Sequence, residues 1–119
     1  FVNAHSAPVA DGCAMIFIET PVFTTLVQSH LTDEDYSKLQ HALLMRPGAG
    51  VLIPGSRGLR KLRWRTEHGG KRGGLRVIYY WYVEDEAIYM LFVYRKNEQE
   101  DLTRQQIKFL SKLIEGALK

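Results

Sequence analysis

The stretch from Leu75 to Tyr94, LRVIYYWYVEDEAIYMLFVY, decides the fold. Residues 75–83 are rich in β-branched and aromatic side chains, which favour extended strands. Residues 84–86 (EDE) form a short acidic turn, and residues 88–94 (IYMLFVY) repeat the strand composition. Because two such runs are joined by a short polar turn, they predict an antiparallel hairpin.

A further strand precedes this hairpin at residues 59–65. Lys61, Arg63 and Arg65 alternate there with Leu62 and Trp64, so the cations share one face of the strand. This alternation predicts a half-buried strand with a cationic face. Residues 67–74 then form a glycine-rich loop that leads into the hairpin.

Three helices and one more strand complete the expected order of elements. Residues 15–19 (MIFIE) form an apolar strand, and Thr20 then caps a helix that opens with Pro21. Thr32 caps a second helix, and the pattern Thr103-x-x-Gln106 is a capping box before a terminal helix. Strands that cluster after the helices predict an α+β fold of order β-α-α-β-β-β-α, an antiparallel sheet with helices packed on one face.

Length and composition predict one domain. The chain has 119 residues, and Met15 opens the first expected strand, so we interpret residues 1–14 as an extension, either translated from upstream or introduced by cloning, and residues 15–119 as the domain. Its single cysteine, Cys13, excludes an internal disulfide and disfavours a cysteine metal site. We expect a cytoplasmic protein without a metal, a cofactor or a membrane span.

Positive charge is concentrated in one segment. The net charge is only +3, but residues 57–76 hold eight Lys or Arg residues against a single acid, Glu67. Such concentrated charge predicts an anionic partner, such as a phosphate backbone. The alternative is a loop whose charges are simply solvated.

Other motifs have weaker functional interpretations. GGKRGG (residues 69–74) has the composition of a phosphate-binding loop, but a strand follows it where such loops need a helix. In YYWY (residues 79–82), only Tyr80 and Tyr82 share a face with Arg76 and suit base stacking; the alternative is cross-strand packing against Tyr89 or Leu91. The histidines have neither the spacing of a zinc site nor that of a catalytic pair.

The cations themselves remain the best candidates for a site. If the three clustered strands are neighbours, Arg76 lies within reach of Lys61, Arg63 and Lys96. Such a cluster binds phosphates and stabilises a pentacovalent phosphorane electrostatically.

Three segments carry a family resemblance: GLRKLR (58–63), GKRGGLRVIYYW (70–81) and YMLFVYRKNEQEDL (89–102). Together they resemble HigB-type toxins of the RelE/ParE superfamily of bacterial toxin–antitoxin systems. The resemblance implies a RelE-like fold and a ribosome-dependent endoribonuclease. Such an enzyme enters the ribosomal A site and cleaves mRNA by attack of the RNA's own 2′-hydroxyl on the adjacent phosphodiester.

The resemblance also implies roles for individual residues. Arg76 would hold the scissile phosphate, and Lys61 and Arg63 would supply a proton acceptor and a charge stabiliser. Lys96 matches a basic residue after the last strand. Where RelE has a second arginine and then a tyrosine, this chain has Asn97 and Thr103, so either Glu98 substitutes in acid–base catalysis or Lys96 and Arg76 act by electrostatics alone. Contacts to RNA or the ribosome are assigned to Arg60, Arg65, Lys71, Arg72, Arg95, Asn97 and Tyr80.

The implied partners are the 70S ribosome with its mRNA and a HigA-like antitoxin that carries a helix-turn-helix domain. Operator DNA would be bound only through that antitoxin. Two rival functions stay open: a ParE-like inhibitor of DNA gyrase that cuts no RNA, and a nucleic-acid-binding domain without toxicity.

Overall fold

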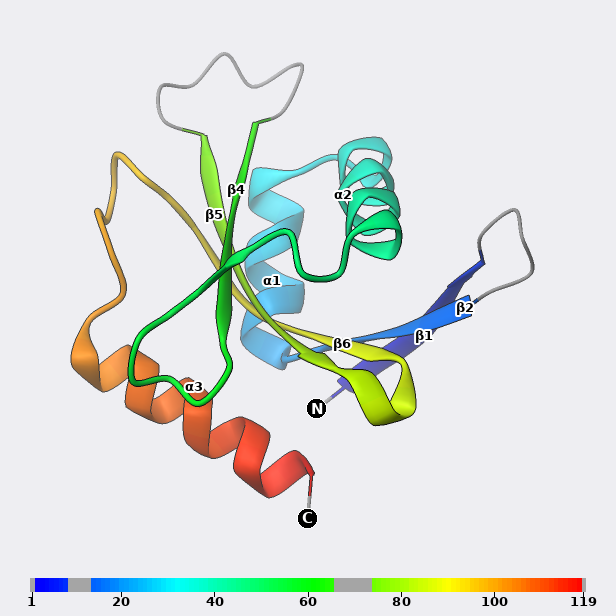
Figure 1. The fold of residues 1–119 in the computed structure, drawn as a ribbon. Coiled ribbons are helices and arrows are strands. Elements are labelled where there is room, and N and C mark those ends of the chain that lie inside the picture. The colour runs from blue at the N-terminus through cyan, green and yellow to red at the C-terminus, as the bar shows by residue number, and fades with distance from the viewer. Residues whose placement is uncertain (1, 9–13, 66–73, 119) are drawn as a thin grey trace.

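The computed structural model describes residues 2–8, 14–65 and 74–118. Figure 1 shows three helices around one sheet. In chain order the elements are β1 (Val2–Pro8), β2 (Ala14–Glu19), α1 (Pro21–His30), α2 (Asp33–Met45), β3 (Val51–Leu52), β4 (Arg60–Trp64), β5 (Leu75–Tyr82), the short 3-10 helix η1 (Val83–Asp85), β6 (Ala87–Arg95) and α3 (Arg104–Ala117). The expected α+β class is confirmed, with β1 and β3 as additional strands.

The strands form one sheet of order β1-β2-β6-β5-β4-β3. The predicted hairpin is present: β5 and β6 pair antiparallel across η1, and β4 pairs antiparallel with β5. However, β2 pairs parallel with β6, so the expectation of a purely antiparallel sheet is wrong. Since α1, α2 and three strands separate β2 from β6, the chain is long enough to return to the sheet in the parallel direction.

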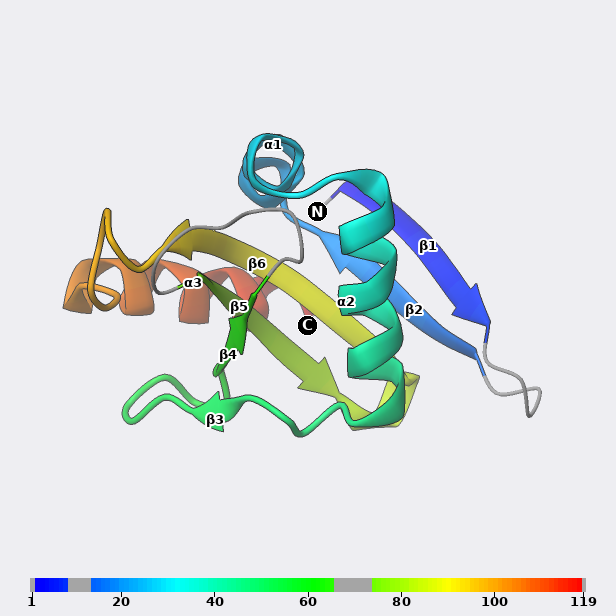
Figure 2. The same ribbon diagram turned by 90° about the horizontal axis from the view of Figure 1, so that it is seen from above.

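Helices cover both faces of the sheet, which corrects the prediction that they pack on one face. Phe23 of α1 and Leu39 of α2 pack against Val77 and Tyr79 of β5. Leu110 of α3 packs on the opposite face with Ile78, and in Figure 2 α2 crosses in front of the strands while α3 lies behind them. Because β5 is apolar on both faces, one layer of helices would leave the second face in water.

The three predicted helix caps are all present. The hydroxyl oxygen of Thr20 accepts a hydrogen bond from the backbone N–H of Phe23 at 2.9 Å. Thr32 accepts one from Asp35 at 3.1 Å. Thr103 forms the expected capping box with Gln106. These caps satisfy N–H groups that have no partner within the helix, so they define where each helix begins.

An irregularity in the β5–β6 ladder changes which residues share a face. Ile78 pairs with Phe92 but the next residue, Tyr79, pairs with Met90, so Leu91 is the extra residue of a bulge. Leu91 and Phe92 both pack on the face of α3. Strict alternation would place Tyr94 on the face of α1 and α2, and the bulge turns it to the face of α3 instead.

Residues 2–8 of the expected N-terminal extension form β1, which pairs antiparallel with β2 at one edge of the sheet. The interpretation of residues 1–14 as an extension to a domain at 15–119 stays a prediction. Among the described residues, no helix has the length and apolar character needed to cross a membrane.

Candidate functional site

Three of the predicted cations share one face of the sheet. Arg63 of β4 lies directly opposite Arg76 of β5, and Lys61 lies opposite Ile78, two residues further along. Because alternate residues of a strand point the same way, Lys61, Arg63 and Arg76 all face the side that α3 covers. We call Lys61, Arg63 and Arg76 the cation cluster.

Arg76 is the most buried charge of the cluster, with 6% of its surface exposed. Its Nη1 donates a hydrogen bond to the carbonyl oxygen of Leu75 at 3.2 Å. Arg63, by contrast, is exposed. A guanidinium held at this depth beside a second one suits an anionic ligand, because an anion offsets both the desolvation and the repulsion.

Tyr94 is the neighbour of Arg76 on its other side, in β6. Its side chain is buried, and within the described part of the chain its hydroxyl makes no hydrogen bond. Burial raises the pKa of Tyr94, the charge of Asp101 raises it further, and the charge of Arg76 lowers it. Sequence reasoning missed Tyr94, because simple alternation along the strand places it on the other face.

Asp101 is a second residue that sequence reasoning missed. Its Oδ1 accepts a hydrogen bond from Nζ of Lys61 at 2.8 Å. That bond is the main cause that lowers the pKa of Asp101, and the charges of Lys61 and Arg76 add to it against the opposing effect of desolvation. The only signal in the sequence is an acid shortly after β6, and two other acids, Glu98 and Glu100, precede it there.

The residues predicted after β6 divide between two places. The backbone N–H of Lys96 donates to the carbonyl of Gly74 at 3.2 Å, which ties this segment to the start of β5, and the side chains of Lys96 and Asn97 are exposed. Arg95 points the other way: its Nε donates to Nδ1 of His30 on α1 at 3.1 Å and lies 3.5 Å from Oε1 of Glu98. The structure therefore pairs Glu98 with Arg95 rather than with the cation cluster.

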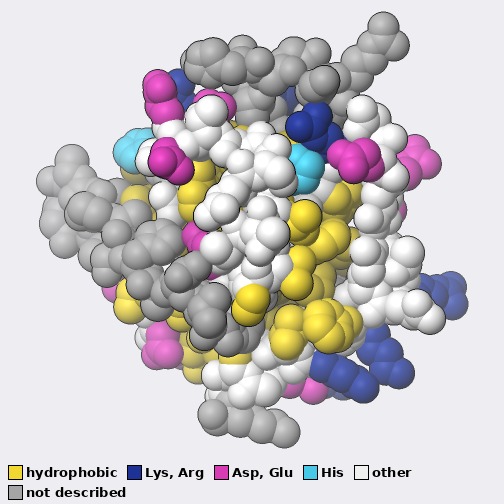
Figure 3. All heavy atoms as spheres, turned by 180° about the vertical axis from the view of Figure 1, so that it is seen from behind, with side chains coloured by type: hydrophobic (Ala, Val, Ile, Leu, Met, Phe, Trp, Pro, Cys, Tyr) yellow, Lys and Arg dark blue, Asp and Glu magenta, His cyan; other side chains and the backbone are white. Residues whose placement is uncertain are grey.

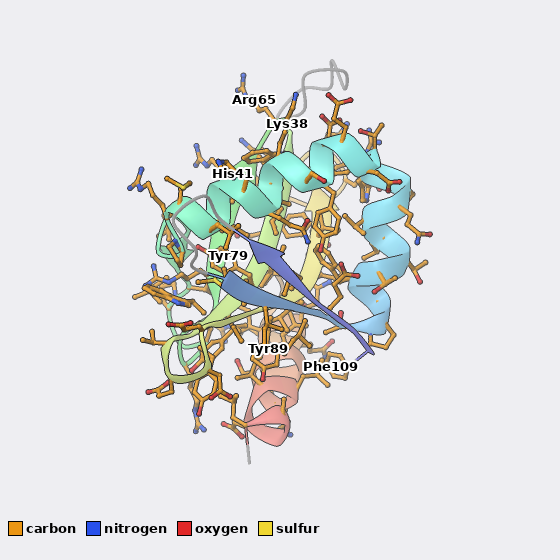
Figure 4. The ribbon with its side chains drawn as sticks, turned by 90° about the vertical axis from the view of Figure 1, so that its right-hand side faces the viewer. Lys38, His41, Arg65, Tyr79, Tyr89 and Phe109 are labelled. Atoms are coloured by element: carbon orange, nitrogen blue, oxygen red, sulfur yellow. The ribbon has the colours of Figure 1, made fainter. Side chains whose placement is uncertain are left out.

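The remaining predicted RNA contacts are scattered. Arg60 lies on the face of α2, where its Nη1 donates to the carbonyls of Gly48 and Gly50 at 3.2 and 2.8 Å. Arg65 is exposed beyond β4, and Figure 4 shows it at the end of the molecule that also carries Lys38, away from Phe109. Lys71 and Arg72 lie outside the described residues.

Tyr80 packs across the strands, which was the alternative to a role in base stacking. It lies opposite Tyr89, with ring centroids 6.5 Å apart, and stacks on Tyr82 at the same centroid distance. It lies four positions beyond Arg76, which is about 13 Å along a strand. Tyr80 thus packs against the hydrophobic core on the face of α3 and is not a member of the cation cluster.

Among the histidine side chains that the structure describes, none lies in the cation cluster. Of the two histidines whose side chains the structure describes, His30 contacts Arg95 and His41 is exposed on α2. The described residues also contain no group of three or more side chains suited to hold a metal ion. The chemistry available on the described part of this face is therefore that of guanidinium and ammonium groups, a buried tyrosine hydroxyl and one carboxylate.

An apolar groove lies apart from the cations, between the start of α1, β6 and α3. Its volume is about 310 Å³, and its lining includes Pro21, Val22, Phe92 and Phe109 but no charged residue. Figure 3, the view from behind, shows hydrophobic side chains gathered on this side of the molecule with Lys and Arg at the lower edge. This groove is distinct from the cation cluster.

No protein-family model matches the chain. Among solved structures, the fold is similar to that of the E. coli toxin RelE, determined in the free state as a mutant with two arginines replaced by alanine, with a TM-score of 0.51 and 16% sequence identity. The match covers 71% of this chain and 85% of the RelE chain. At this identity the likeness concerns the fold, and the chain has the RelE-like α+β fold that the sequence motifs predicted.

Proposed function

We propose that this protein is the toxin of a type II toxin–antitoxin system and a ribosome-dependent endoribonuclease that cleaves mRNA in the A site. The observation that carries the proposal is the buried Arg76 directly opposite Arg63, with Lys61 on the same face of a RelE-like fold. The HigB-type motifs of the sequence support the finer assignment within the RelE superfamily.

The proposed reaction is a transesterification. The 2′-oxygen of the RNA loses its proton and attacks the adjacent phosphorus, the bond from phosphorus to the 5′-oxygen breaks, and a 2′,3′-cyclic phosphate and a 5′-hydroxyl result. Negative charge on the pentacovalent phosphorane is stabilised by positive groups that are held in place before the reaction. We assign this role to Arg76 and Arg63, with Lys61 and Lys96 at the edges.

The acid–base step has two candidate solutions. Glu98 contacts Arg95 on the side of α1, which disfavours it as the substitute acid or base. The geometry thus favours the electrostatic alternative, in which Arg76 and Lys96 stabilise the leaving oxygen and water carries the protons. Lys61, whose ammonium is engaged by Asp101, then serves as the charge stabiliser and Arg63 as the second phosphate ligand.

The proposal includes partners and a compartment. The 70S ribosome would present the mRNA, and a cognate HigA-like antitoxin with a helix-turn-helix domain would neutralise the toxin and bind operator DNA. These interactions take place in the cytoplasm. The cation cluster contacts RNA phosphates, whereas the antitoxin has other surfaces available, among them the apolar groove.

The test is inducible expression in bacteria with mapping of mRNA 5′ ends and measurement of gyrase supercoiling. We expect codon-phased cuts with the wild-type chain and none with Arg76→Ala. Arg46→Ala, which removes an exposed arginine at the end of α2, is the matched control and should keep the cleavage. Growth arrest with intact messages and inhibited gyrase would instead support a ParE-like inhibitor and contradict the proposal.

A further inference from the structure

A second hollow, which we call the α3 groove, lies between α3 and the loop that precedes β4. Its volume is about 470 Å³. The loop contributes Pro54, Gly55 and Arg57, and the charged residues of the helix that line it are Arg104, Lys108, Lys112 and Glu115. Arg57 and Glu115 form an ion pair across the groove. None of these four cations belongs to the predicted site.

The other three cations form an uncompensated row. Arg104, Lys108 and Lys112 are spaced by four residues, so they lie on one face of α3 about 6 Å apart along the axis. Within the described part of the chain, no ion pair links any of them to an acid. Like charges at this spacing repel, and Arg104 in the first turn also opposes the positive end of the helix dipole. The row therefore costs stability in the free protein.

The α3 groove is continuous with the surface around Lys61. An adjoining hollow of about 280 Å³ shares Pro54 and Ile107 with it and is also lined by Lys61 and Asp101. Lys61 lies two residues before Arg63, which faces Arg76. One surface thus leads from Lys112 along α3 to the cation cluster.

We propose that the α3 groove binds the single-stranded RNA that flanks the cleaved bond, through contacts of Arg104, Lys108 and Lys112 with successive phosphates. The inference deepens the proposed function, on which it rests for the identity of the strand. Both acids that line the two hollows are already engaged, Glu115 by Arg57 and Asp101 by Lys61. The remaining charge is positive, and a row of cations that tracks a backbone is how single strands are bound without regard to sequence.

The direct test measures binding of a short, non-cleavable 2′-O-methyl RNA by the purified full chain over a range of salt concentrations. The test variant is Lys108→Glu/Lys112→Glu, and the milder Lys108→Gln/Lys112→Gln checks that reversal of charge does not act through the fold. Arg46→Glu, at the end of α2, is the control. Thermal unfolding establishes that each variant is folded.

We expect the reversed variant to bind about tenfold more weakly, and the slope of log affinity against log salt to fall by about 1.4, since each phosphate contact of a single strand contributes about 0.7. The Lys108→Gln/Lys112→Gln variant should lose less RNA affinity than the Lys108→Glu/Lys112→Glu variant. Arg46→Glu should also lose less than the Lys108→Glu/Lys112→Glu variant. Wild-type affinity and slope in both α3 variants would overturn the inference. If the α3 variants lose binding to an acidic peptide but bind RNA as the wild type does, the groove binds a protein instead. That outcome would also overturn the inference.

The cleavage reaction separates this inference from the proposed function. In a reconstituted translation system the Gln variant should raise KM with little change in kcat, whereas Arg76→Ala should lower kcat. If the wild-type chain does not cleave, the proposed function fails, while the RNA-binding comparison still decides whether the groove binds a single strand.

Discussion

Arg63 and Arg76 lie directly opposite each other on neighbouring antiparallel strands. Like charges at such positions destabilise a sheet, so this pair costs stability in the free protein. We expect Arg63→Thr to raise the free energy of unfolding by about 0.2–1 kcal/mol and to reduce cleavage. Chemical denaturation at low and high salt measures the first effect, and the gain should shrink at high salt.

Arg65→Thr is the matched control for this prediction, since Arg65 is exposed beyond the end of β4. A gain in stability that is equal in both variants would show that the cross-strand pair carries no special cost. If Arg63→Thr raises stability but does not reduce cleavage, Arg63 does not belong to the proposed site.

Tyr79 anchors the chain between α2 and β3. Its hydroxyl donates to the carbonyl of Pro47 at 2.6 Å and accepts from the N–H of Gly50 at 2.8 Å, and its side chain is fully buried. Tyr79→Phe leaves two polar backbone groups without their partner, so we expect a loss of about 1–3 kcal/mol in the free energy of unfolding. Tyr82→Phe, at a half-exposed position of the same strand, should lose less than half of this, and equal losses would contradict the prediction.

Gly58 carries a conformation that other residues rarely adopt. Its φ is +112°, and a Cβ there would lie 2.9 Å from Cε1 of Tyr80. Gly55 also has a positive φ, +73°, but open space around it. We expect Gly55→Ala to cost about 1–2 kcal/mol for the backbone alone. Gly58→Ala should cost more, because Tyr80 must also move, and thermal unfolding of both variants checks the order.

His30 links stability to pH. Burial lowers the pKa of His30 from its ordinary value of 6.5, Arg95 lowers it further, and Glu98 partly opposes them. Because the unfolded chain then binds a proton more readily than the folded one, this contribution to stability is present above pH 6.5 and is lost as the pH falls below it. His30→Gln should therefore flatten the fall in melting temperature on acidification.

His41→Gln is the control for this pH prediction, since His41 is exposed on α2. Melting curves from pH 8 down to about pH 5 cover the range over which an ordinary histidine titrates. A wild-type slope in the His30 variant, or an equal change in both variants, would contradict the prediction.

The sequence correctly predicted the features that depend on residues close together in the chain. The caps at Thr20, Thr32 and Thr103 each depend on a hydroxyl and an N–H three residues later, and the hairpin depends on two apolar runs around a polar turn. The face of β4 that carries Lys61 and Arg63 follows from the alternation of side chains along a strand. In each case the interaction links residues that are close in the sequence.

Predictions that needed long-range pairing were incomplete. The parallel pairing of β2 with β6 and the position of α3 on the second face depend on how the whole sheet is covered. The partner of Lys61 is Asp101, forty residues away, and no local pattern selects it among the acids that follow β6.

The sequence by itself thus determined the three helices with their N-terminal caps, the strands β2, β4, β5 and β6, and the side of β4 and β5 on which the cations stand. Only the tertiary structure decided what surrounds Arg76. The bulge at Leu91 shifts the alternation of β6, which places Tyr94 beside Arg76 and turns Arg95 to His30 on the opposite face. A one-residue shift in pairing inverts every side chain beyond it, and that shift depends on how two strands fit together.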